Sequence, residues 1–251
     1  YNSGGSLVYN GLAPIYGRTI WLPGSGDDPK INWSGEGAAS EIEVKLHLSP
    51  DEDSSQWLGR GFYRVTHGFN SFGELEGVES ETRGHLTKVI KGVFAKAKLT
   101  DYSLAVFNRF TITAGFEFEL PFEKDDFGRH VIDFGSPAGG IMDKMPSNVK
   151  LSMNHRSSPI RLPGMMVEKL EIKLALPAFE TTYTPDNMEI DNAIGRFSVS
   201  SGIDAEEITI LKELSLTESS IADEDWELLR ELLLSHKSKG NTVLMLRKNG
   251  D

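Results

Sequence analysis

Residues 110–120 read Phe-Thr-Ile-Thr-Ala-Gly-Phe-Glu-Phe-Glu-Leu, and the alternation in this stretch decides the fold class. Every second residue carries an apolar side chain, and the residues between them are threonine, glycine or glutamate. Successive side chains of a strand point to opposite faces, so the pattern predicts a strand with one buried and one solvated face. Strands of this kind are typical of antiparallel sheets.

The same alternation recurs along the chain. It predicts strands at 41–48 and at 169–176, the second ended by Pro177, and shorter strands at 17–22, 59–67, 195–201, 206–216 and 242–247. Two segments, at about 78–98 and 222–238, instead repeat apolar residues every three or four positions. We therefore expect a mainly β fold of antiparallel sheets in a sandwich-like arrangement, with two amphipathic helices.

The second helix has the clearer end signals. Trp226 begins its apolar stripe, Ser220 is the expected N-cap, and Gly240 is the expected C-terminal stop. His236 falls in the last turn, where a cation complements the helix dipole. This placement predicts a purely structural role for His236.

The chain divides by composition. Residues 1–16 are expected to be a linker leading out of an upstream domain, because the sequence begins at Tyr1 without an initiator Met. Residues 17–122 form the expected β-rich subdomain with one helix. Turn-forming Gly, Pro, Asn and Asp clusters follow, and we expect 123–251 to be a sandwich-like C-terminal subdomain.

Charge and cysteine content remove several function classes. The 251 residues include 26 Lys plus Arg against 37 Asp plus Glu, a formal net charge of −11, and no cysteine. A thiol nucleophile, a disulfide framework and a Cys-based metal site are therefore excluded. The acidic balance argues against nucleic-acid binding, which needs a basic surface for phosphates. No apolar run approaches the roughly 20 residues that span a bilayer.

Searches for catalytic patterns also fail. The sequence has no phosphate-binding loop, dinucleotide-binding loop, zinc-protease motif or nucleophile elbow, and its six histidines are not at metal-binding spacing. The acidic clusters at 51–53 and 125–126 fall in expected turns, where aspartate bonds the local backbone. We therefore expect no catalytic, cofactor-binding or metal-binding residue, although paired carboxylates of a hydrolase remain a third possibility.

Two groups of residues are candidates for contacts. His155, Arg156 and Arg161 lie in a segment rich in X-Pro pairs, where an arginine either holds a ligand carboxylate or ties a loop to a sheet. The tryptophans Trp21, Trp33 and Trp57 would line a glycan- or peptide-binding face if their side chains are exposed. Trp226 is expected in the core.

The segment containing Arg156 carries a family resemblance. Arg156-Ser-Ser-Pro-Ile160, followed after a short gap by the alternating strand 167–176 and Pro177, resembles the C-terminal β-domains of bacterial transglutaminase-like proteins. Residues 221–230, an acidic turn followed by an aromatic residue and a helix, and the last strand at 243–247 fit the same pattern. Members of that family carry an N-terminal β-domain, a papain-like transglutaminase core and an all-β tail.

The resemblance implies a non-catalytic role, because the family's catalytic cysteine has no counterpart in this chain. It implies an accessory or recognition region that braces an upstream transglutaminase-like core, or binds a protein or glycan partner through a sheet face. The corresponding location is periplasmic or cell-surface. A stand-alone carbohydrate- or peptide-binding β-sandwich is the alternative.

Overall fold

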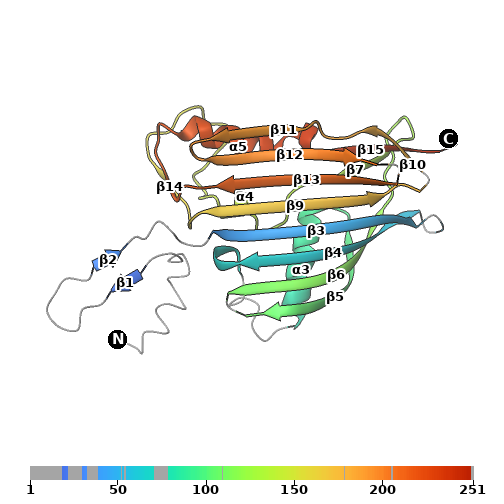
Figure 1. Ribbon diagram of the computed structural model, residues 1–251, viewed down its shortest axis with the longest axis horizontal. Coiled ribbons are helices and arrows are strands. Elements are labelled where there is room, and N and C mark those ends of the chain that lie inside the picture. Colours follow the sequence, from blue (N-terminus) through green and yellow to red (C-terminus); the bar gives the residue numbers. More distant parts are fainter. Residues whose placement is uncertain are drawn as a thin grey trace.

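Eight of the alternating strands pair into one large sheet, in the order β11-β12-β13-β9-β3-β4-β6-β5 (Figure 1). The computed structural model describes residues 19–21, 30–32, 39–51, 53, 55–70, 79–108, 110–177, 179–204 and 206–249. The eight strands are β3 (Ser40–Asp51), β4 (Gln56–Thr66), β5 (Lys98–Phe107), β6 (Thr111–Pro121), β9 (Met166–Ala175), β11 (Met188–Asn192), β12 (Gly195–Ile203) and β13 (Glu207–Leu216).

The centre of this sheet is a parallel pair. β3 and β9 run in the same direction, with Val44 opposite Leu170, whereas all the other pairs in the sheet are antiparallel. The mainly β fold predicted from the sequence is confirmed, and the large sheet is mixed rather than purely antiparallel. Parallel neighbours need a long connection, and 114 residues separate the end of β3 at Asp51 from the start of β9 at Met166.

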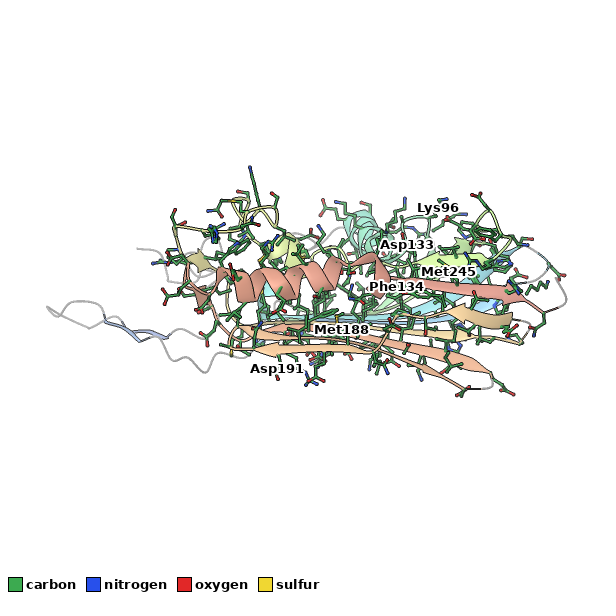
Figure 2. All side chains as sticks on the ribbon, turned by 90° about the horizontal axis from the view of Figure 1, so that it is seen from above. Lys96, Asp133, Phe134, Met188, Asp191 and Met245 are labelled. Carbon is green, nitrogen blue, oxygen red and sulfur yellow. The ribbon has the colours of Figure 1, made fainter. Side chains whose placement is uncertain are left out.

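The connecting segments build a second layer over one face of the sheet (Figure 2). It contains α3 (Glu79–Val93), the short α4 (Ile141–Lys144), α5 (Trp226–Lys237) and a three-stranded sheet, β10-β15-β7. The small sheet consists of β7 (His130–Asp133), β10 (Phe179–Tyr183) and β15 (Val243–Lys248). Two further antiparallel pairs join β8 (Ile160–Arg161) to β14 (Ser220–Ile221) and β1 (Thr19–Trp21) to β2 (Lys30–Asn32). Short 3₁₀ turns lie at His67–Phe69 and Lys239–Asn241.

The core fills the space between the two layers. On β4 two glycines leave room for phenyl rings of the neighbouring strand, because Gly59 lies opposite Phe118 and Gly61 opposite Phe116. A Cβ atom at Gly59 would stand 2.1 Å from the Phe118 ring. The rings therefore lie over β4, and Phe118 packs in turn against Phe94, the residue that follows α3.

The other face of the large sheet carries charge of both signs. Glu41 on β3 meets Lys169 on β9 at 3.1 Å and Arg64 on β4 at 3.7 Å. Lys173 lies near both Glu171 and Glu207, at 3.8 and 3.7 Å. In the described part of the chain, the helices and the small sheet lie over the opposite face (Figure 2). We call this charged surface the open face.

Several element ends differ from the sequence prediction. The helix expected over 78–98 ends at Val93, although Phe94 and Ala97 remain buried. The second helix begins at Trp226 rather than near 222, and Ser220 pairs in β14 instead of capping it. Phe110 precedes β6 and is 54% exposed, so its predicted place on the buried face is wrong.

The predicted subdomain boundary falls just after β6. Strands from both sides of residue 122 share the large sheet, because β3 pairs with β9, and they contribute to one hydrophobic cluster. The division into 17–122 and 123–251 stays a prediction. Residues 1–16, the expected linker, lie outside the described residues. No helix within the described ranges is long and apolar enough to cross a membrane.

Candidate functional site

Three ionisable side chains lie inside the molecule between the large sheet and α5. They are Glu168 on β9, Lys212 on β13 and His236 in the last turn of α5, exposed by 2%, 4% and 1%. Charged side chains are rarely buried to this extent unless they are paired. We call these three residues the buried charge cluster.

The local sequence explains why each side chain points inward. Glu168 follows Met166 and precedes Leu170 in the alternation of β9, and Lys212 lies between the buried Ile210 and Leu214 in β13. Period-two alternation places both charges on the apolar face. His236 lies three residues after the buried Leu233 and so shares the apolar stripe of α5.

Glu168 joins three elements through its two carboxylate oxygens. Oε1 lies 3.0 Å from Nε2 of His236, and Oε2 accepts a 2.8 Å hydrogen bond from the backbone N–H of Ile141 at the start of α4. Burial by itself would raise the pKa of Glu168. The hydrogen bonds and charge of His236, the Ile141 N–H and the charge of Lys212 outweigh burial and lower that pKa.

The carboxylate of Glu168 also lies close to the main chain. A Cβ atom at Gly140 would stand only 2.2 Å from Oε2, so a larger residue there would displace the carboxylate. Gly140 is the residue before α4, and its lack of a side chain lets the loop approach β9. The space left by Gly140 and the hydrogen bond from the Ile141 N–H together fix the position of the Glu168 carboxylate.

Lys212 is the least satisfied member of the cluster. Its Nζ is buried and has no hydrogen-bond partner among the described residues, and no described carboxylate lies within ion-pair distance. Burial lowers the pKa of Lys212 to about 8, partly opposed by the charge of Glu168. An unpartnered buried ammonium is energetically unfavourable.

A cavity of about 340 Å³ adjoins the cluster, and Glu168, Lys212 and His236 all line it. Apolar contributions come from Phe134, Pro137 and Met142, and exposed charged side chains, including Lys239 and Asp133, stand at its border. Figure 2 shows Asp133 and Phe134 in the second layer, near the junction of α5 and β15. The exposed border residues indicate that the cavity opens to solvent.

Ser136, His236 and Glu168 have the composition of a hydrolase triad but not its arrangement. Ser136 Oγ and Glu168 Oε1 both approach Nε2 of His236, at 3.3 and 3.0 Å. In a triad the nucleophile and the orienting carboxylate bind opposite ring nitrogens. Nδ1 of His236 is buried without a hydrogen-bond partner among the described residues. The present arrangement orients the ring and joins β9 to α5.

The contact candidates predicted from the sequence lie elsewhere. Arg156 lies over the Trp226 ring at 5.4 Å, and its guanidinium donates a 2.9 Å hydrogen bond to the carbonyl of Asn148. It therefore ties a loop to α5. His155 is exposed and lines a separate hollow of about 260 Å³ beside the start of α5, and Arg161 is exposed on β8.

The tryptophans divide between core and undescribed positions. Trp57 is 1% exposed and packs against Phe122 and Phe179 at ring distances of 4.9 and 5.2 Å, so it does not meet the condition of exposure for a binding face. Trp226 is buried as predicted. The Trp21 side chain and Trp33 lie outside the described residues.

A turn accounts for the acidic cluster at 125–126. Asp125 accepts backbone hydrogen bonds from Phe127 and Arg129 and pairs with the Arg129 guanidinium at 2.6 Å. No group of three or more His, Asp or Glu side chains in the described part of the chain is arranged to hold a metal ion.

Comparison with known proteins gives limited matches. Residues 140–246 match the family described as "Domain of Unknown Function with solved-structure structure", DUF3858, and this segment contains β9, β13 and α5. No curated protein matches the chain. One solved structure, described as a "putative protease" from Parabacteroides distasonis, is similar with a TM-score of 0.41 and 17% sequence identity. That similarity covers 49% of this chain and 24% of the other, so this chain spans about a quarter of that protein.

Proposed function

We propose that this chain is the non-catalytic accessory region of a transglutaminase-like protein, and that it packs against that protein's enzymatic core. The observation that carries the proposal is the position of the family-like segment 156–177. It forms β8, a short loop and the central strand β9, and it falls within the residues that match DUF3858. The resemblance therefore involves the centre of the scaffold.

The bonding of the buried charge cluster supports a structural assignment. Both carboxylate oxygens of Glu168 are engaged in contacts that join β9 to α4 and α5. Ser136 and Glu168 both contact Nε2 of His236, so the ring does not bridge a nucleophile and an acid through its two opposite nitrogens. This arrangement favours a scaffold over an acyl-transfer site.

We place the contact with the core on the open face. Glu41 lies between two basic side chains there, and Lys173 lies between two acidic ones, so this face presents alternating charge from central strands. Such a surface suits a polar protein partner with complementary charges, which give specificity and register. A glycan-binding face would need exposed aromatic rings, and the buried Trp57 does not supply one.

The test combines the gene with a binding measurement. The reading frame upstream of Tyr1 is expected to encode a cysteine-containing transglutaminase-like core, which is then produced separately and titrated with this chain by calorimetry. The charge-reversal variants E41K and K169E, each made singly, should weaken binding. The K91M substitution at an exposed position of α3 should leave binding unchanged.

Two results would contradict the proposal. One is a frame that encodes no such core, or a core that does not bind. The other is hydrolase or acyl-transfer turnover by the purified chain that E168Q abolishes while folding is retained.

A further inference from the structure

We propose that the cavity beside Lys212 binds a small carboxylate whose apolar body rests on Phe134, Pro137 and Met142. The proposal goes beyond the accessory role and does not depend on it. Two independent features point to a ligand: a cavity that opens to solvent, and a buried ammonium that lines it without a hydrogen-bond partner among the described residues.

The cavity has the size and lining of a small-molecule site. Its volume of about 340 Å³ lies near the lower end of the range of ligand pockets, which begins at roughly 300 Å³. Such pockets are mostly apolar, with a few polar groups that fix the orientation of the ligand. Here the apolar part comes from the 134–142 segment and the polar part from β9, β13 and α5.

The positive charge of Lys212 favours a ligand with a negatively charged hydrogen-bond acceptor. Lys212 has donors only, so a carboxylate oxygen would satisfy it with a charge-assisted hydrogen bond. Glu168 does not fill this role in the structure, because its oxygens bind His236 and Ile141 and no ion pair joins it to Lys212. At the border, Lys237 and Lys239 offset Asp133 and Asp143, so the approach is not strongly repulsive to an anion.

A ligand amine is disfavoured by the same geometry. Among the described residues that line the cavity, its deeply buried acidic partner would be Glu168, whose two oxygens each already have a hydrogen-bond partner, and the Lys212 ammonium beside it would repel a second cation. A neutral amide would accept a hydrogen bond from Lys212 but would leave the positive charge uncompensated. We therefore expect the order carboxylate, amide, amine for ligands with the same apolar body.

The experiment uses hexanoate, hexanamide and hexylamine at equal concentration, with inorganic phosphate as a general anion. Thermal unfolding of the whole chain is recorded with each probe. Hexanoate at tenfold its dissociation constant should raise the midpoint by about 3 °C, because it binds only the folded state. Hexanamide should raise it less, and hexylamine and phosphate should not raise it.

K212M provides the matched variant, and K91M on the exposed surface of α3 provides the control. Loss of a charge-assisted hydrogen bond should weaken hexanoate binding by about tenfold or more in K212M, with no change in K91M. The NMR titration of the Lys212 side chain gives a second readout. Its pKa should move back toward the ordinary lysine value when hexanoate is bound, because the bound carboxylate favours the charged form.

The remaining outcomes contradict the proposal. Equal effects of the three hexyl probes would show an apolar cavity without a role for Lys212. Hexanoate binding that survives in K212M would place the carboxylate elsewhere. A phosphate effect equal to that of hexanoate would identify a general anion site, and no response to any probe would mean that the cavity is not a ligand site.

Discussion

At the scale of single residues, Lys212 offers the sharpest test of the structure. Its pKa in the folded state is about 8, against 10.5 for an ordinary lysine, so the folded protein holds the charged form unfavourably. The groups facing it from the packed elements are Glu168 and His236, and the attraction of Glu168 is already included in that value. K212M should therefore raise the free energy of unfolding by about 3 kcal/mol below pH 8.

The sign of the pH dependence follows from proton binding. Between pH 8 and about 10 the unfolded chain holds more protons at Lys212 than the folded chain does, so wild-type stability rises with pH. The advantage of K212M should shrink over the same interval. Urea unfolding at pH 7 and pH 10 measures this, with K91M as the control. If K212M is less stable than wild type at pH 7, the conclusion that the buried Lys212 ammonium lacks a partner is wrong.

Glu168 should behave in the opposite way. E168Q removes the buried negative charge nearest to Lys212 and the carboxylate partner of His236, and we expect a loss of about 3 kcal/mol at neutral pH. The lowered pKa of Glu168 means that its contribution is present above its ordinary value of 4.5 and disappears as the pH falls. Acid unfolding of E168Q should therefore be less steep in this range.

A double-mutant cycle isolates the coupling between these two charges. E168Q should cost less in the K212M background, because no ammonium is then left uncompensated. Equal costs in both backgrounds would mean that the two residues do not interact.

Sequence pattern could place these side chains but not bring them together. The alternation of β9 and β13 already puts Glu168 and Lys212 on the apolar phase, which is the signal that sequence reasoning passed over. Their meeting with His236 depends on the pairing of β9 with β13 and on the packing of α5. Both are long-range contacts that local periodicity does not contain.

At the scale of elements, the end of α3 shows how closely two parts of the second layer pack against each other. A Cβ atom at Gly92 would stand 2.5 Å from the backbone nitrogen of Ala138 and 2.6 Å from the carbonyl oxygen of Ser136. Gly84 is an exposed residue of the same helix, and a Cβ atom there would have no neighbouring atom within 4 Å. The two positions therefore separate packing from helix propensity.

G92A should destabilise the protein by about 2 kcal/mol, because backbone atoms cannot yield easily to the added methyl group. G84A should stabilise it by about 1 kcal/mol, since alanine favours the helix over glycine and meets nothing there. Urea unfolding of both variants gives the comparison. Similar effects of the two substitutions would mean that α3 does not pack on the 135–138 segment as observed.

Elements with strong alternation were predicted well, and those without it were missed. β3, β6, β9 and β13 lie where their patterns indicate. β5 was not predicted, because this edge strand exposes residues on both faces and shifts register twice, between Leu99 and Asp101 and between Leu104 and Val106. Edge strands need no continuous apolar side, so periodicity is a weak guide to them.

At the scale of the whole molecule, the parallel pair β3–β9 links the two segments that composition separates. Nine residue pairs join the strands, from Ser40 opposite Met166 to Leu48 opposite Leu174. Composition shows where turns cluster, but it does not show which strands share a sheet. The hydrophobic cluster continues across this pair, so we expect residues on both sides of 122 to unfold together.

Two buried tryptophans allow this to be measured. Trp57 on β4 lies before the predicted boundary, and Trp226 at the start of α5 lies after it. Substituting the other three tryptophans by phenylalanine leaves one reporter in each case. A single cooperative unit loses all its structure in one transition. Far-UV circular dichroism measures the stability of each variant separately. After correction for that stability, the Trp57 and Trp226 reporters should give the same urea midpoint and the same slope. If instead one fluorescence transition precedes the circular dichroism transition, the segments before and after residue 122 are separate folding units, and the β3–β9 pairing is an interface between them.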